Sequence, residues 1–543
     1  CTLEYPQKLA GQKKKLPDFV LQDKEFMSEY LKAHGFKGAL LEKALGDVNK
    51  KGSQQSFTFG KEEEVSLEAD LSWHVRAWGR WVLARARKEL AQYYPVVAEF
   101  EPIDKTARKW ERREPKVTPI DEDGNTVIDE LNKEFSAEYL ADLRNPRYVA
   151  KPTVAYLWAR TVKCKNCRAT IPLLKTRWLC KKDNKRVLLK MEPNEKRDGV
   201  VFSIEKDVPE VGGNSAQKKA HDKEIGAGTM SRAGVLCACC GNILPTENIR
   251  MEGQGDRLGV ALSSCVVESA VGKEYRSPIS EEISFSVNNA QAEVFGALPF
   301  GPLIESTPAG GGKGAGRAFS VQGYGFMQWG DLYTSRQQLA LGVFAREIRE
   351  ATNHAKLIGY SSDWATALQL YSACILSRTA DYMAQLCVWE KAAEEIKHVF
   401  MRWALPVTCD FAEANPLAPI ERFFSGGIGS AGRVLANLFA CSWNDTYVPR
   451  VINRSALTDT NEKYDFILTD PPYYDAIPYS DLMDFFYIWL RRVLGDINEE
   501  FSNAFGCQLA PKWNGIKKDG ELIDDDSRHG GNSAESKASY EDG

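Results

Sequence analysis

Residues 464–473 read Tyr-Asp-Phe-Ile-Leu-Thr-Asp-Pro-Pro-Tyr, and this stretch decides the fold that the sequence predicts. Its apolar first half predicts a buried strand that leads directly into the tetrapeptide Asp470–Tyr473. From residue 411 onward, hydrophobic runs alternate with glycine turns, which is typical of an α/β fold. Ligands of an open α/β sheet bind beyond the carboxyl ends of its strands, where this tetrapeptide would lie. The tetrapeptide is therefore the first candidate for a functional site.

The tetrapeptide carries groups that suit the activation of an exocyclic amine on a nucleobase. The lone pair of such a nitrogen is delocalised into the ring, so the amine is a poor nucleophile. The Asp470 carboxylate and the Pro471 carbonyl can each accept one N–H hydrogen bond, which stabilises positive charge as it develops on the nitrogen. Pro471 and Pro472 stiffen the loop, and Tyr473 can stack on a base taken out of a duplex. The alternative is a structural stop after a strand; an apolar strand, aspartate, two prolines and an aromatic in succession favour catalysis.

A helix is expected to follow the tetrapeptide and to begin at Pro478-Tyr479-Ser480. Its apolar side chains recur three and four residues apart, as one buried helix face requires: Leu482, Phe486, Trp489 and Val493. Most aromatic residues of this segment are expected in the core. Tyr474 and Tyr479 are the candidates for contact with a substrate base.

Four of the thirteen cysteines form two pairs with the spacing of metal ligands, Cys164 with Cys167 and Cys237 with Cys240. Two such knuckles would close a four-thiolate structural zinc site that has no open coordination position. Gly241 suits the turn that the second knuckle needs. Cys239 could replace Cys237, but the two-residue gap favours Cys237 and Cys240. The alternative is that these cysteines are unpaired buried residues.

The 69 residues between the pairs exceed the separation of about 15–20 residues in a simple zinc ribbon. This spacing predicts an inserted β-rich segment, with strands at Val187–Leu189 and Val200–Ile204. The stretch Lys175–Arg197 holds nine Lys or Arg and three Asp or Glu residues. It is a candidate phosphate-contacting surface, and the alternative is an ordinary solvated face.

The composition is that of a large globular chain. At roughly 150 residues per domain, 543 residues predict three or four domains. The 70 basic and 74 acidic residues leave a net charge of −4, which excludes a uniformly basic nucleic-acid coat protein. The sequence contains neither a membrane-spanning apolar run of about 20 residues nor an opening signal-peptide pattern. We therefore expect a cytoplasmic protein with reduced cysteines and no membrane partner.

Changes in pattern divide the chain into five segments. Residues 1–150 are expected to be mainly helical, 151–300 to hold the zinc ribbon and its insertion, 301–328 to be a Gly-rich linker, 329–410 to be helical, and 411–543 to hold the catalytic segment. The first helical segment shows an amphipathic stripe at Val75, Trp78, Val82 and Ala86. The second begins with a capping box, Thr334 followed by Gln337. The loop Ser306–Gly316 has glycine after its lysine, which favours a flexible linker over a phosphate loop.

The run Asp470–Arg492 resembles the large prokaryotic adenine-specific DNA methylases that carry an inserted zinc ribbon and often occur in phage-defence loci. The likeness extends over most of the chain. It includes Trp158–Cys164, Trp329–Thr334, Asp381-Tyr382, Phe411–Pro416 and Arg528–Gly530.

The resemblance implies a Rossmann-like fold, S-adenosylmethionine as methyl donor, the N6 amine of adenine in DNA as acceptor, and phage-defence proteins as further partners. It places Ser455 and Ala456 near the adenine of the donor. The family's donor-binding glycine loop would lie upstream of the region matching Cys1, so the chain is expected to be a fragment with an incomplete Rossmann-like domain. Gly427–Gly432 fits a Gly-x-Gly-x-x-Gly pattern, but a lone match of this kind is a weak signal.

Other functions remain open at the level of sequence. The tetrapeptide is also compatible with an RNA amine methyltransferase and with a cytosine-N4 DNA methyltransferase. A zinc-ribbon DNA-binding component without catalytic activity is the alternative from another class of protein.

Overall fold

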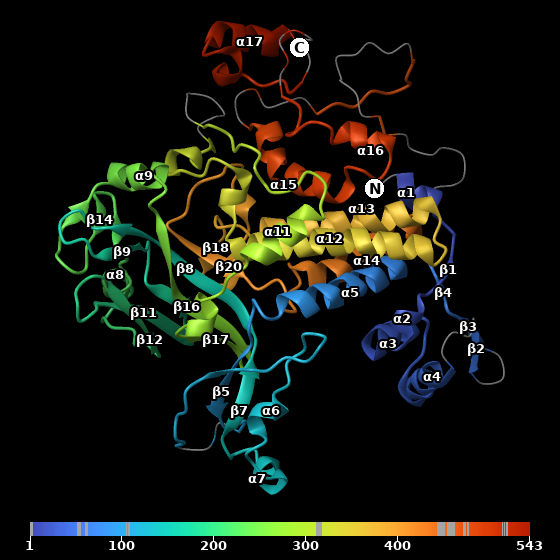
Figure 1. Ribbon diagram of the computed structural model, residues 1–543, viewed down its shortest axis with the longest axis horizontal. Coiled ribbons are helices and arrows are strands. Elements are labelled where there is room, and N and C mark those ends of the chain that lie inside the picture. The colour runs from blue at the N-terminus through green and yellow to red at the C-terminus, as the bar shows by residue number, and fades with distance from the viewer. Residues whose placement is uncertain are drawn as a thin grey trace.

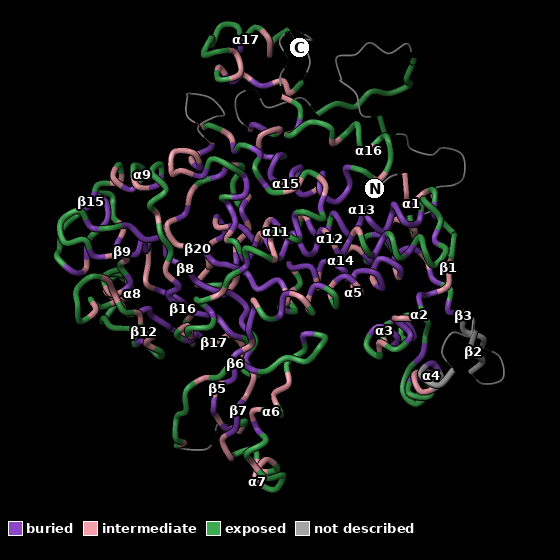
Figure 2. The backbone as a smooth tube through the Cα atoms, viewed as in Figure 1, coloured by how far each residue is buried: buried purple, intermediate pink, exposed green. Residues whose placement is uncertain are grey.

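The computed structural model describes residues 4–51, 56–59, 63–104, 106, 109–310, 318–441, 451–452, 462–470, 474, 477–512, 514, 516 and 520–542. The fold is mixed α/β, with a layer of long helices beside several sheets (Figure 1). The helical layer consists of α5 (Leu71–Leu90), α11 (Asn288–Gly296), α12 (Ser335–Leu357), α13 (Ser362–Asp381), α14 (Phe424–Ala440) and α15 (Tyr479–Leu494). Figure 2 shows that most of this layer is buried.

The two helices with the clearest sequence signals form as predicted. In α5, the Asp70 side chain accepts a hydrogen bond from the backbone N–H of Ser72, and the predicted stripe from Val75 to Ala86 is buried. In α12, the Thr334 hydroxyl accepts from the Gln337 N–H, and the Gln337 side chain accepts from the Thr334 N–H. Both helix starts therefore satisfy backbone donors that would otherwise lack partners.

Helices α5 and α14 approach each other closely at Gly79. A Cβ atom at Gly79 would lie 2.7 Å from Cγ1 of Ile428 in α14. Ile428 is buried in the same hydrophobic core as Trp78 and Val82. The glycine-rich stretch Gly427–Gly432 lies inside α14. Its small residues thus serve helix packing, which agrees with the low weight that a lone Gly-x-Gly-x-x-Gly match carries as a cofactor loop.

The central sheet is antiparallel. It has five strands in the order β17 (Gly272–Arg276), β16 (Gly259–Ser269), β8 (Thr153–Lys163) and β20 (Asp410–Ala414), with β9 (Thr170–Leu173) pairing the end of β8. Every residue of β8 before Lys163 is buried. Among the described residues, parallel pairing is limited to the isolated bridge Phe319–Leu405. The mixed α/β class is confirmed, but the described strands do not form the open parallel sheet expected of a Rossmann-like fold.

A buried ion pair joins the helical layer to this sheet. Arg336, in the first turn of α12, donates from Nε to Oε1 of Glu413 at 2.7 Å and from Nη2 to Oε2 at 2.9 Å. The indole N–H of Trp158 in β8 donates to the same carboxylate at 2.7 Å. Arg336 and Glu413 are fully buried, so each charge depends on the other for compensation.

Smaller units surround this core. Near the N-terminus, helices α1 (Glu4–Lys8), α2 (Asp18–Leu21), α3 (Lys24–Ala33) and α4 (Gly38–Lys51) accompany the strand pairs β1 (Lys14–Lys15) with β4 (Glu68–Ala69) and β2 (Ser56–Phe59) with β3 (Glu63–Ser66). A second unit contains the sheet β6 (Lys116–Val117), β5 (Val97–Glu101) and β7 (Arg147–Lys151), with α6 (Asp129–Asn132) and α7 (Ala137–Ala141).

The segment between residues 170 and 260 is β-rich, as expected. It holds the sheet β10 (Trp178–Lys182), β11 (Lys185–Pro193) and β12 (Val200–Lys206), and the sheet β13 (Met230–Ser231), β14 (Gly234–Leu236) and β15 (Ile243–Leu244). The helices of this region are α8 (Ser215–Ile225) and α9 (Thr246–Gln254), and α10 (Ser280–Ile283) follows β17. The hairpin β18 (Val388–Glu390) and β19 (Glu395–Lys397) precedes β20. Helices α16 (Glu499–Ala504) and α17 (Ser533–Asp542) follow α15.

The predicted linker 301–328 packs into the core in its described parts. Phe319 and Val321 are buried in the main hydrophobic cluster. Glu305, also buried, accepts hydrogen bonds from Arg491 and Arg492 at the end of α15. These contacts hold residues on both sides of 311–317 against the protein, because a paired carboxylate buried this deeply fixes the backbone that carries it. Among the described helices, none has the length and apolar character needed to cross a membrane.

Candidate functional site

The four predicted cysteine ligands meet in space. Cys164 follows β8 directly, and Cys237 follows β14 directly. Sγ of Cys164 lies 3.7 Å from Sγ of Cys240, and Sγ of Cys167 lies 3.7 Å from Sγ of Cys237. All four sulfur atoms lie within 4.8 Å of one another. A tetrahedral Zn²⁺ with bonds of about 2.3 Å separates its sulfur ligands by about 3.8 Å, so this cluster could bind a metal with the size and softness of zinc.

The two knuckles have the same backbone form. In the first, the Arg168 N–H donates to the Cys164 carbonyl at 2.9 Å; in the second, the Gly241 N–H donates to the Cys237 carbonyl at 2.9 Å. Arg168 and Gly241 both have positive φ, 64° and 74°. The position after each second cysteine therefore requires the left-handed conformation that glycine adopts most easily.

The structure decides between Cys237 and Cys239. Cys237 belongs to the four-sulfur cluster, whereas the Cys239 thiol donates to the carbonyl of Gly199 at 3.3 Å. Of the two predicted alternatives, Cys237 therefore lies with Cys240 in the cluster, and Cys239 does not. Burial raises the pKa of Cys237 to about 12, and the N–H of Asn242 lowers the pKa of the Cys240 thiol to about 6.

A second cluster of possible metal ligands, made of three glutamates, resembles a metal site only by composition. The carboxylates of Glu99, Glu101 and Glu274 lie close together. The buried Lys151 ammonium occupies the space between them, with Nζ at 2.7, 3.0 and 2.8 Å from the three carboxylates. The group is therefore an internal ion cluster built around a lysine.

In the middle of the basic stretch Lys175–Arg197, the basic side chains pair with acids from elsewhere in the chain. Lys182 lies 2.6 Å from Glu394, and Lys181 lies 2.9 Å from Asp222, which also pairs with Arg186. The hydrogen bond from Arg186 lowers the pKa of Asp222 to about 2. Paired in this way, the middle of the stretch does not offer the free cationic surface that a phosphate backbone would contact.

The segment that leads to the tetrapeptide differs from its prediction. Residues 462–470 form no strand in the structure, and Phe466, Ile467 and Leu468 are 84%, 73% and 90% exposed. The prediction of a buried strand here is wrong for this structure. No described strand pairs with the segment, and a strand with two apolar faces needs sheet neighbours and cover on both sides to be buried.

Three of the predicted site residues on this segment are described. Asp470 is exposed, Tyr474 is 38% exposed and Tyr479, the first residue of α15, is 40% exposed. Pro471, Pro472 and Tyr473 lie outside the described residues, as do the predicted donor contacts Ser455 and Ala456.

Tyr474 is held by the C-terminal part of the chain. Its backbone N–H donates to the hydroxyl of Tyr540 at 3.1 Å, and its carbonyl accepts from the N–H of Asp524 at 3.2 Å. The two tyrosine rings meet edge to face with centroids 4.7 Å apart. Tyr474 has a φ of 51°, a strained value for a bulky residue that its surroundings must enforce.

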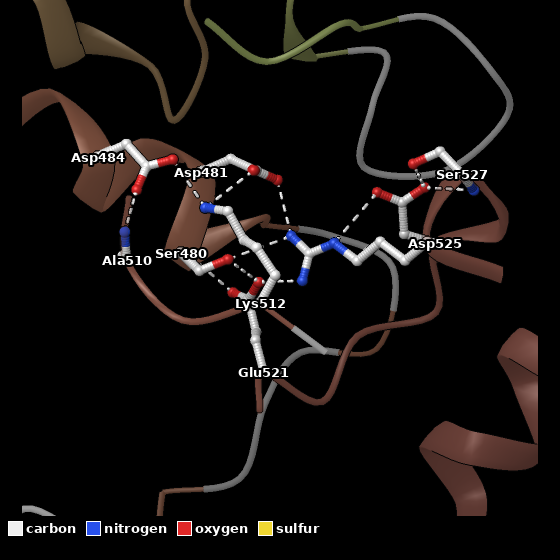
Figure 3. A network of polar contacts seen from close by, with 9 residues as sticks. Ser480, Asp481, Asp484, Ala510, Lys512, Glu521, Asp525 and Ser527 are labelled. Atoms are coloured by element: carbon white, nitrogen blue, oxygen red, sulfur yellow. Dashed lines mark hydrogen bonds and ion pairs between the residues drawn. The ribbon is translucent and has the colours of Figure 1, made fainter. Parts of the chain in front are cut away.

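A polar network fixes the start of α15 to Lys512, Glu521 and Arg528, which follow this helix in the chain (Figure 3). The Arg528 guanidinium lies 2.7 Å from Asp481 and 2.6 Å from Glu521, and Lys512 lies 3.0 Å from Asp481 and 2.8 Å from Asp484. Burial raises the pKa of Asp484 to about 6, against the opposing effect of Lys512. The network explains why the backbone around Ser480 is held in one place.

The sequence did not reveal the acids and bases of this network as a group. Asp481 and Asp484 stand three residues apart on one helix face, which is a weak signal because exposed faces carry the same pattern. Their partners lie 28 to 47 residues further along the chain. Only the structure brings them together.

Comparisons of the chain with protein-family models, with curated proteins and with solved structures found no match.

Proposed function

We propose that this chain takes part in the transfer of a methyl group from S-adenosylmethionine to the N6 amine of adenine in DNA. The proposal rests on two features that flank Pro471–Tyr473: the carboxylate of Asp470 is accessible, and the backbone of Tyr474 is anchored by a hydrogen bond. An acceptor loop needs an accessible carboxylate and a fixed backbone, because its hydrogen bonds must be in place when charge develops.

Asp470 would accept one N–H of the adenine amine, and the Pro471 carbonyl would accept the other. The two acceptors stabilise the cationic nitrogen, which loses a proton after it has taken the methyl group, so no base of unusual pKa is required. Tyr473 would stack on the extracted base. When bound, the donor supplies a methyl group on a sulfonium. Its pocket is not assigned to described residues, since Gly427–Gly432 is helical.

The four-cysteine cluster is proposed to hold a structural zinc ion within a ribbon. Cys164, Cys167, Cys237 and Cys240 would bind the metal as thiolates, and four sulfur ligands leave no position for a substrate. The zinc would fix β9 and the β13–β15 sheet relative to the end of β8. The proposed role of this region is to contact DNA, in a protein that serves phage defence or restriction–modification together with other defence proteins.

The test compares Asp470→Asn with Asp465→Asn, an exposed aspartate on the same segment. Methyl transfer from a tritiated donor is measured on DNA and on tRNA with the full-length protein. We expect Asp470→Asn to lower the rate at least about 100-fold, in line with the loss of a charge-stabilising group, and Asp465→Asn to leave the rate unchanged. Full activity in Asp470→Asn would reject the proposal, and transfer to tRNA or to cytosine would establish the RNA or cytosine-N4 alternative.

A zinc-ribbon DNA-binding component without catalysis is the second candidate. It is favoured by the contrast between the complete four-cysteine cluster and the unpaired segment 462–470. Equilibrium binding separates the two candidates: DNA affinity without any affinity for S-adenosylmethionine in the full-length protein would establish the second.

A further inference from the structure

The C-terminal part of the chain holds the residue that directly follows the candidate acceptor loop. The Tyr474 N–H donates to the hydroxyl of Tyr540 at 3.1 Å, and the Tyr474 carbonyl accepts from the N–H of Asp524 at 3.2 Å. The ring of Tyr540 also packs edge to face against the ring of Tyr474. Both backbone polar groups of Tyr474 are therefore bonded to residues far along the chain, 66 positions away in the case of Tyr540.

The backbone conformation of Tyr474 depends on these contacts. Its φ of 51° lies in the left-handed region, which a bulky residue occupies only when its surroundings enforce it. A return to an ordinary negative φ would turn the preceding residues in another direction. Pro471 and Pro472 have a nearly fixed φ, so the loop would transmit such a turn to its acceptor groups and would not absorb it.

The helix that carries Tyr540 is itself tied to the start of α15. Of the ten described residues of α17, Ser536 alone is buried, and its hydroxyl donates to the Asp524 carboxylate at 2.6 Å. Arg528, four residues after Asp524, pairs with Asp481 in the first turn of α15 at 2.7 Å (Figure 3). The short segment that begins at Asp524 therefore joins α17 to the first turn of α15.

We propose that Tyr540 is a positioning residue for methyl transfer. Its hydroxyl and ring keep Tyr474 in the left-handed conformation, and Tyr474 then fixes the direction of the Pro471 carbonyl relative to the Asp470 carboxylate. A fixed direction matters because the two acceptors must already be aimed at the amine when charge develops on it. The role rests on the proposed function of Asp470–Tyr473, and Tyr540 acts through Tyr474 without contact with the substrate.

The test uses Tyr540→Phe in the full-length protein, which keeps the ring and removes the hydroxyl that accepts from Tyr474. Hydrogen exchange in peptides that cover residues 474–482 should become about 2- to 10-fold faster, as the loss of one hydrogen bond predicts, and exchange in α12 should not change. The kcat of methyl transfer to DNA should fall about 10- to 100-fold with an unchanged KM for DNA, because a displaced loop still binds the substrate but holds its amine out of line. Tyr139→Phe is the matched control. Tyr139 lies in α7, at the other end of the molecule from α17 (Figure 1), and its hydroxyl donates to the Pro146 carbonyl at 3.0 Å, so neither measurement should change.

Ser536→Ala provides a second variant, because it releases α17 from Asp524 and leaves the side chain of Tyr540 unaltered. It should change both measurements in the same direction. Unchanged exchange in Tyr540→Phe, or full kcat in this variant while Asp470→Asn is inactive, would overturn the positioning role and leave the proposed function standing. A raised kcat would also overturn it, since α17 would then restrain the loop. If the unmodified protein transfers no methyl group to any acceptor, the proposed function fails and the positioning role fails with it.

Discussion

At the scale of single residues, the two knuckles differ in how well their sequence fits their backbone. In the second knuckle, Gly241 adopts the required left-handed backbone conformation. In the first knuckle, Arg168 adopts the same conformation although it carries a side chain. Residues other than glycine adopt this conformation at a cost of about 1–2 kcal/mol. The backbone is therefore strained beside Cys167 and relaxed beside Cys240.

Gly241→Ala is expected to destabilise the protein by about 1 kcal/mol, after the lower entropy of the unfolded alanine chain is taken into account. No atom lies within 4 Å of a Cβ at this position, so the effect would come from the backbone alone. Arg168→Gly should change stability in the opposite direction or by less. Denaturant unfolding with saturating zinc measures both, and equal losses in the two variants would contradict the argument.

Asp484 gives a prediction about pH. Its carboxyl is buried, and its pKa is raised from 3.8 to about 6. The folded state therefore binds a proton at Asp484 more tightly than the unfolded state does. Because of this, the free energy of unfolding of the protein falls as pH rises from about 4 to 6. Asp484→Asn keeps an acceptor for the Ala510 N–H. Relative to this variant, the unmodified protein should lose about 2–3 kcal/mol of unfolding free energy over that pH range. Unfolding free energies of both proteins at pH 4 and pH 7 measure the difference, and a constant difference would refute it.

At the scale of elements, the contact between α5 and α14 depends on one missing side chain. Gly79→Ala places a methyl group 2.7 Å from Ile428, and overpacking of this kind costs about 1–3 kcal/mol. Ile428→Ala makes room for the methyl group. Chemical denaturation of the two single variants and the double variant should therefore show a double variant more stable than the two single losses predict. Additive losses would show that the helices do not press on each other at this point.

The elements also show which parts of the fold the sequence could predict. The residues of the α5 stripe lie within a few positions of one another, and so do the two residues of the α12 capping box. Local physics therefore determines both features. The run Phe466–Leu468 has the composition of a strand, but a strand forms only with neighbours, and no described strand pairs with it. The glycine pattern Gly427–Gly432 was a weak signal for a loop, because small residues serve helix packing equally well, and it lies inside α14.

At the scale of the whole molecule, the four-cysteine cluster connects β8, β9 and the sheet β13–β15. Removal of bound metal with a chelator is expected to release this region while the helical layer remains folded, since the helices pack in a hydrophobic core separate from the one around the cysteines. Hydrogen exchange should rise in residues 229–250 and stay unchanged in α12 and α13. Cys164→Ser should lose the metal in an elemental assay, and Cys239→Ser, whose thiol points to Gly199, should keep it.

The candidate site was predictable to a similar degree. The cysteine spacing gave all four sulfur ligands, because two residues between thiolates is a local rule that geometry enforces. The polar network at the start of α15 gave no such signal. Its basic side chains, Lys512 and Arg528, follow the acids of α15 by 28 to 47 positions. Only folding brings them to one place.

The pairing of β8 with β20 has a consequence for biosynthesis. Trp158 and Glu413 are separated by 255 positions. At a translation rate of about 5–20 residues per second, the edge of β8 that pairs with β20 therefore stays unpaired for roughly 13–50 s. During that interval a nascent chain exposes an apolar strand with unpaired backbone groups. A chaperone that shields residues 153–163 on the ribosome should therefore raise the yield of native protein more than one that acts after release.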